Sequence, residues 1–286
     1  MTASTTSFSI NASAEPGTTP AGGTRGEKRL RRASIRRLIR AEWVKLRSVR
    51  GTWLLAGGTI LSTTVFSALS LSGSIADWQQ GLPPGWNATG STLRGTIIGQ
   101  VIVAMLGASA MSSEYRTGTI STTLTIAPQR GRVLLAKTTV TGLTVLATAA
   151  VSVALSFGAG QAILAGAGLP TALPIGAGAI RALASSVGYL LCSGILGLSF
   201  ATMSRSSTGA LAIMVAISLV APSSLSALPG RLGEFLAKYW PISAGMDSFA
   251  PIRDTPLPPV LGIGIMAGFT LCSALASHIT LRVRDI

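Results

Sequence analysis

The sequence is poor in the residues that enzymes use for chemistry. Its 286 residues include one His, two Cys and nine Asp and Glu, and only 11% are charged, where a soluble domain has roughly a quarter. Two cysteines are too few for a disulfide framework and are expected to act as small apolar residues. We assign no catalytic, cofactor-binding or metal-binding residue, and the composition excludes an ordinary soluble domain.

Charge is absent from long stretches of the chain. A helix needs about 20 predominantly apolar residues to cross a membrane, and the charge-free runs are 51–76, 95–113, 138–180, 182–204, 206–230 and 255–281. The third run is too long for one helix, and Gly and Pro between 158 and 178 indicate a break. The sequence therefore predicts an all-α, polytopic membrane protein with six transmembrane helices, near 52–75, 95–113, 138–161, 180–203, 207–228 and 258–281.

The basic residues predict how the chain lies in the membrane. Lys and Arg favour the cytoplasmic side, and with both termini cytoplasmic the outer side keeps only Arg94, Arg181, Arg231, Lys238 and Arg253. Topology and anionic lipids then explain the net charge of +14, and we expect no nucleic-acid partner. We expect residues 1–34 to be a disordered basic cytoplasmic tail and 35–286 to be the membrane domain, in a bacterial plasma membrane.

An amphipathic helix is predicted at 35–50, before the first span. Ile35, Leu38, Ile39, Trp43 and Leu46 recur at helical spacing, with arginines on the other side. Such a helix is expected to lie along the inner membrane surface. Glu42 falls within the apolar stripe, so it should pair with a neighbouring Arg or contact another protein. The candidate interface residues are Arg36, Arg40, Glu42, Trp43, Lys45 and Arg47.

A short charged segment at 114–137 separates the second and third spans. Thr117 or Thr119 is a suitable helix cap, Glu114 carries the charge favoured near a helix N-terminus, and Pro128 ends the element. The pattern predicts a helix of two or three turns on the cytoplasmic side. A short rigid helix between two spans is suited to transmit a push from another protein.

Three stretches resemble the permease subunits of type 2 ATP-binding-cassette (ABC) transporters. They are AEWVKLRSVRGTW, EYRTGTISTTLTIAPQRGRVLLAK and YWPISAG, and the resemblance covers about residues 35–286. It implies a dimer of permeases, identical or different, bound to two copies of a separately encoded ATPase. The ATPase, not this chain, would bind ATP and Mg and hydrolyse ATP. The resemblance further implies export of a drug, peptide, lipid or other amphiphile.

The resemblance also assigns roles to residues. The helix at 35–50 would be the elbow helix, and 114–132 would carry the coupling helix. Ile120 and Leu124 would fill an apolar groove on the ATPase, with arginines facing its acidic rim. The candidate ATPase-coupling residues are Glu114, Tyr115, Arg116, Gly118, Thr119, Ile120, Leu124, Pro128, Arg130 and Arg132.

A transport path is expected along the second and fifth spans, which border the route in the resembled family. Weakly polar residues there are Gln100, Ser109, Ser112, Ser218 and Ser223, although helix packing explains such residues equally well. Between 228 and 259, Leu232, Phe235 and Leu236 indicate a short amphipathic helix. The resemblance implies that helices here partly re-enter the outer leaflet.

Three alternatives remain open. A secondary carrier is one, although the span cores lack the ionisable residues that ion coupling usually needs. A rhomboid-like intramembrane protease would use Ser199 and His278, which need to lie within hydrogen-bond reach. The stretch 131–138 places Gly131 and Lys137 at P-loop distance, but its interior is aliphatic. A helical start to the third span explains it better.

Overall fold

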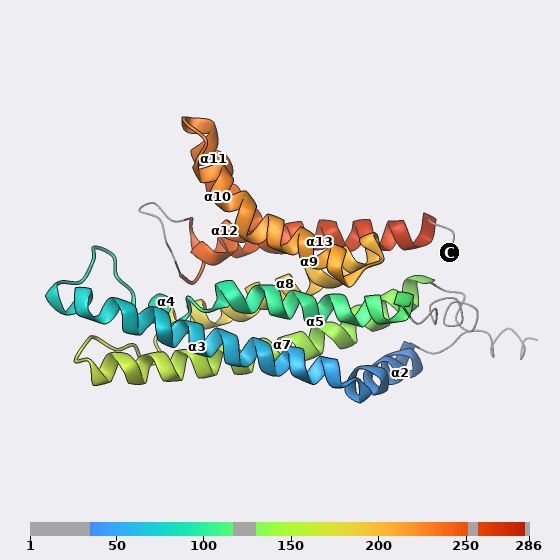
Figure 1. Cartoon of the computed structure of the whole chain (residues 1–286), viewed down its shortest axis with the longest axis horizontal. Coiled ribbons are helices and arrows are strands. Elements are labelled where there is room, and N and C mark those ends of the chain that lie inside the picture. The colour runs from blue at the N-terminus through green and yellow to red at the C-terminus, as the bar shows by residue number, and fades with distance from the viewer. Residues whose placement is uncertain (1–34, 117–129, 251–256, 284–286) are drawn as a thin grey trace, which may run out of the picture. The chain divides into compact units, whose positions relative to one another are not determined.

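A computed structural model describes residues 35–116, 130–250 and 257–283, all within the unit Ser34–Ile286 (Figure 1). Throughout these ranges the regular structure is helical and contains no strand. The helices are α2 (Ile35–Ser48), α3 (Arg50–Gln80), α4 (Ala88–Thr92), α5 (Thr96–Arg116), α7 (Arg130–Gly166), α8 (Ala177–Ser204), α9 (Ser207–Val215), the π turn η1 (Ala216–Val220), α10 (Ala221–Ser226), α11 (Arg231–Tyr239), α12 (Pro241–Asp247) and α13 (Pro259–Val283).

Six described helical stretches are apolar and long enough to cross a membrane, which confirms the six-span, all-α prediction. They are Arg50–Gln80, Thr96–Ser113, Gly131–Gly166, Ala177–Ser204, Ser207–Ser226 and Pro259–Leu281. At roughly 1.5 Å of rise per residue, the 31 residues of α3 and the 37 of α7 are longer than a hydrocarbon core of about 30 Å. The third span predicted at 138–161 is therefore the middle of a longer helix.

Helix α8 packs against α5, α7 and α13, and α3 packs against α5 and α7 (Figure 1). Glycines bring α5 and α8 together closely. A Cβ atom at Gly107 would lie 1.9 Å from the carbonyl oxygen of Gly194, and one at Gly197 would lie 1.9 Å from that of Ala104. Larger residues would force the two helices apart. Close contact through small residues is how membrane helices associate in the absence of a hydrophobic drive.

The fifth span is not a single regular α-helix. Helices α9 and α10 are joined by η1, and Trp240, just before α12, donates its indole N–H to the carbonyl oxygen of Ile217 at 2.7 Å. The segment that follows the span is thus bonded back to the π turn. Such turns are rare and often occur at functional sites. The sequence predicted one uninterrupted span at 207–228, so this irregularity is a finding of the structure.

Helix α11 confirms the short amphipathic helix expected between residues 228 and 259. Leu232 is 69% exposed and Phe235 is 57% exposed, whereas Gly233 and Ala237 face the fold. The apolar side chains that motivated the prediction therefore point away from the protein, where lipid can cover them.

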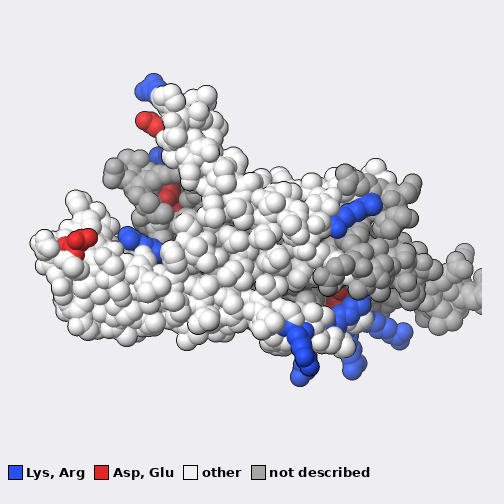
Figure 2. All heavy atoms as spheres, viewed as in Figure 1, with Lys and Arg blue, Asp and Glu red and all other residues white. Residues whose placement is uncertain are grey.

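The connection between α3 and α5 contains the short buried helix α4. The side chain of Asn87 accepts hydrogen bonds from the backbone N–H groups of Thr89 and Gly90, which caps this helix. Nearby, the guanidinium of Arg94 lies 5.6 Å from the centroid of the Trp78 ring. Figure 2 shows charges of both signs around α4 and α11, whereas basic side chains predominate around α2.

Candidate functional site

Helix α2 presents a mainly apolar stripe to helix α7. Its sequence, IRRLIRAEWVKLRS, contains no Gly or Pro, and Ile39, Glu42 and Leu46 recur at helical spacing. Glu42 and Leu46 are buried, Ile39 packs against the core, and α2 lies along α7. The Ser48 hydroxyl and the Trp53 indole donate to carbonyl groups of the last turn, which satisfies groups that a helix end leaves unpaired.

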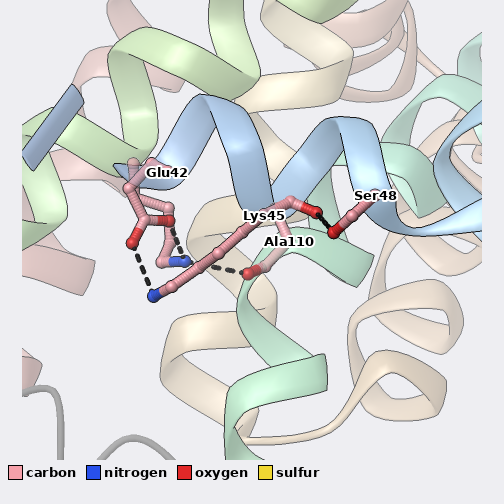
Figure 3. Close-up of polar contacts among 5 residues, drawn as sticks. Glu42, Lys45, Ser48 and Ala110 are labelled. Carbon is pink, nitrogen blue, oxygen red and sulfur yellow. Dashed lines mark hydrogen bonds and ion pairs between the residues drawn. The ribbon is translucent and has the colours of Figure 1, made fainter. Parts of the chain in front are cut away.

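A buried ion pair joins this stripe to the neighbouring helices. The ammonium of Lys137, on α7, donates to Oε2 of Glu42 at 2.7 Å and to the carbonyl oxygen of Ala110, on α5, at 3.1 Å. Lys45 donates to Oε1 of Glu42 at 2.9 Å from the neighbouring turn of α2 (Figure 3). The Lys137 side chain is 3% exposed, that of Glu42 is 6% and that of Lys45 is 50%. One carboxylate and one buried ammonium therefore connect α2, α5 and α7.

The electrostatics of the pair keep Glu42 ionised. Burial by itself would raise the pKa of the Glu42 carboxyl. The charge and hydrogen bond of Lys137, joined by those of Lys45, outweigh burial, so the net pKa of Glu42 lies below its ordinary value of 4.5. Removing either buried partner is expected to be strongly destabilising, because the remaining charge loses the ion pair that offsets its burial.

This arrangement corrects one expectation for Glu42. Its intrachain partners are two lysines, one on α7, rather than a neighbouring arginine. Of the other candidate elbow residues, Trp43 is 46% exposed, and the side chains of Arg36, Arg40, Lys45 and Arg47 are also exposed. The contact of that exposed surface with the inner leaflet stays a prediction.

Half of the ten candidate ATPase-coupling residues fall beyond the ranges that the structure describes. Gly118, Thr119, Ile120, Leu124 and Pro128 lie outside the described residues, as do the proposed caps Thr117 and Thr119. The candidates that do lie in helices are Glu114, Tyr115 and Arg116 in the last turn of α5, and Arg130 and Arg132 in the first turn of α7. Arg132 is exposed. The docking role of this set stays a prediction.

The candidate path residues have different surroundings. Gln100 is fully buried between α5 and α8, where it accepts a hydrogen bond from the Tyr189 hydroxyl and donates to the carbonyl of Ile97 at 3.2 Å. Ser218 is also buried, and Ser223 is exposed. Ser109 and Ser112 are half-buried. Gln100 thus has a structural partner within the chain, and the lining of a transport path stays a prediction.

The structure bears on the two enzyme-like alternatives. Ser199 is 2% exposed and its hydroxyl donates to the carbonyl of Ile195 at 2.8 Å. No hydrogen bond joins Ser199 to His278, although both lie within the described ranges. The P-loop-like stretch 131–138 lies within helix α7, so it does not form the glycine-rich turn that holds phosphate.

The rest of the described chain adds little chemistry. Cys192 is half-buried and Cys272 is exposed, and both are free thiols. Over residues 35–116, 130–250 and 257–283, no three His, Cys, Asp or Glu side chains are close enough together to hold a metal ion. The buried Glu42–Lys137 pair is therefore the most distinctive polar feature of the described part of the chain.

Six apolar helical stretches, each long enough to cross a membrane, define the described part of the chain as a multi-pass integral membrane protein. Within that class the family can be stated. The model of the ABC-2 family transporter protein matches residues 38–223, which is more than half of the chain, and the chain belongs to this family. It is a transport permease, the membrane component of an ABC transporter. Comparison with curated proteins gives no match.

Proposed function

We propose that this chain is one half of an exporter whose energy comes from a separately encoded ATPase. The family match carries this proposal, because ABC-2 membrane components act with an ABC ATPase. Two copies of this chain, or this chain and a related permease, would bind two ATPase subunits in a bacterial plasma membrane. The transported substrate would be an amphiphile such as a drug, peptide or lipid.

The docking surface we propose is the segment 114–132 between α5 and α7. Its flanks are the ends of two long helices that pack against other spans, so a displacement there would tilt α5 and α7 within the membrane. ATPase closure on ATP would in this way change which side the dimer cavity faces. Support comes from the charge and helix signals in the sequence and from the packing of the flanking helices against other spans.

A matched pair of leucine substitutions tests the docking surface. Leu124→Asp places a charge in the proposed contact, and Leu173→Asp places the same charge on an exposed leucine between α7 and α8. Each variant would be expressed with an ABC ATPase that the unsubstituted permease retains, such as one encoded by a neighbouring gene, and the ATPase retained on the tagged permease would be measured. We expect Leu124→Asp to lose the ATPase and Leu173→Asp to retain it. Retention by both, at equal membrane levels, would contradict the assignment.

The carrier alternative keeps one specific observation in its favour. Glu42 and Lys137 are buried ionisable groups, and such groups in membrane proteins often mark coupling sites. A carrier would move substrate in vesicles without ATP when an ion gradient is present. The proposed exporter requires the ATPase and ATP, so transport in vesicles lacking the ATPase distinguishes the two.

A further inference from the structure

The Lys137 ammonium links three helices, its own and two others. It belongs to α7, it is bonded to the Glu42 carboxylate of α2, and it donates to the carbonyl of Ala110 in α5. The two contacts reach across 95 and 27 residues of chain. Residues 117–129 connect α5 to α7, so Lys137 links the two helices on either side of this connection. Helix α2 is bonded to the same ammonium through Glu42 (Figure 3).

Stability alone does not explain why charges occupy this position. Burying two ions requires their desolvation, and apolar residues of similar volume often serve stability equally well or better. The same region already contains apolar contacts, with Leu46 of α2 and Leu134 of α7 in one buried cluster. Unlike apolar contacts, an ion pair holds the two helices at one position relative to each other. If α2 slid along α7 by one turn, both charges would be buried without each other.

Lys45 has a different place in this arrangement. It bonds the second oxygen of Glu42, but its side chain is 50% exposed, so water can replace it at little cost. The buried contact between Glu42 and Lys137 is thus the part of the arrangement that resists displacement of α2.

We propose that the Glu42–Lys137 pair is a positioning lock, which makes α2 move as one body with the adjoining ends of α5 and α7 during transport. Helix α2 is then a force-bearing part of the permease rather than only an anchor at the membrane surface. The inference rests on the proposed function for the source of the movement. Glu42 and Lys137 are positioning residues, since neither is placed against substrate.

The test separates position from stability. Glu42→Gln and Lys137→Met each remove one charge of the pair and leave the other buried without it, whereas the double variant removes both charges of the pair and is expected to fold. Spin labels would replace the exposed residues Val44 on α2 and Leu135 on α7, after both native cysteines have been changed to serine. The label-to-label distance would be measured in lipid nanodiscs, first without the ATPase and then with the neighbouring-gene ATPase trapped by ATP and vanadate.

We expect one narrow distance in the unsubstituted protein, unchanged between the two states. The double variant should lose this single distance and show a broad distribution, broadest in the trapped state. Arg37→Met, which removes an exposed cation from α2, is the matched control and should keep the narrow distance. A double variant with the same narrow distance in both states would overturn the lock.

The two proposals fail in different ways. If the unsubstituted permease binds no ATPase, the proposed function fails, and the distances measured without the ATPase still decide whether the pair holds α2 on α7. If the ATPase binds and the double variant keeps one narrow distance, the lock is wrong and the proposed function stands. Thermal unfolding of the double variant checks that a broad distribution does not come from an unfolded protein.

Discussion

At the scale of single residues, the fold depends on a few buried polar groups. Glu42 and Lys137 neutralise each other between α2 and α7, and Gln100 and Tyr189 satisfy each other between α5 and α8. In the first pair the charges are opposite, and in the second the Tyr189 hydroxyl donates a hydrogen bond to the Gln100 side-chain oxygen. A substitution at one partner therefore costs more than the contact itself, because the remaining buried group loses the contact that offsets its desolvation.

The Glu42 carboxyl should make the stability of the protein depend on pH. Its pKa is lower in the folded protein than the ordinary value of 4.5, so its contribution is complete above that value and is lost as the pH falls through the folded pKa. Glu42→Gln should cost about 3 kcal/mol at neutral pH, and its difference from the unsubstituted protein should close in strong acid. Thermal unfolding in detergent across this pH range measures the difference. Glu234→Gln, on exposed α11, is the control, and a Glu42 difference that did not vary with pH would contradict the assignment.

Tyr189→Phe should destabilise the contact between α5 and α8. The variant keeps the ring, which packs edge-on against Phe249 at 5.4 Å between centroids, but it leaves the buried Gln100 oxygen without its donor. We expect a loss of about 1 to 3 kcal/mol in unfolding free energy, measured by denaturant unfolding. Tyr239→Phe, on exposed α11, should change little. Equal effects of the two substitutions would show that the buried hydrogen bond does not matter.

At the scale of elements, the sequence predicted what depends on local pattern. Six apolar runs are visible without any knowledge of packing, because hydrocarbon excludes charge along a whole span. The charges of Arg130, Arg132 and Lys137 placed the predicted start of the third span at 138, although the sequence favoured a helical start over 131–138, and α7 begins at Arg130. The sequence did not predict the π turn, because the spacing of apolar residues does not reveal one extra residue in a helical turn.

The missed ion pair left a signal in the sequence. Lys137 lies on the buried side of α7 with Val133 and Val140, four residues before it and three after it, just as Glu42 lies in the apolar stripe of α2 with Leu46. Each is a lone charge within an apolar stripe, and the two signs are opposite. This coincidence suggests a pair, but only the packing of α2 on α7 establishes it, because 95 residues of chain separate the two side chains.

The π turn should depend on the indole of Trp240. Trp240→Phe removes the hydrogen bond to the Ile217 carbonyl but keeps an aromatic side chain against the core. We expect a loss of about 1 kcal/mol and faster hydrogen exchange at the amides of Ala216–Val220, measured by mass spectrometry. Trp43→Phe, at an exposed position on α2, serves as the control. Unchanged protection of η1 in Trp240→Phe would show that the turn is held by the span alone.

At the scale of the whole molecule, every functional conclusion depends on orientation. The family match covers residues 38–223 and identifies a permease, and the docking proposal further requires the segment between α5 and α7 to face the compartment that contains the ATPase. Basic side chains gather around α2, at the same ends of α5 and α7 that Glu42 and Lys137 join (Figure 2). By the distribution of Lys and Arg, this end should be cytoplasmic.

Cysteine labelling measures the orientation directly. In a cysteine-free background, Leu173→Cys and Arg231→Cys introduce thiols at exposed positions of the predicted outer side, and Arg37→Cys and Ser204→Cys do so on the predicted inner side. A membrane-impermeant maleimide should label the first two in intact cells. The other two should react only after the membrane is opened, because lipid separates them from the reagent. The reverse pattern would place the proposed docking segment where no ATP-hydrolysing partner reaches it, and the energy source would then have to be an ion gradient.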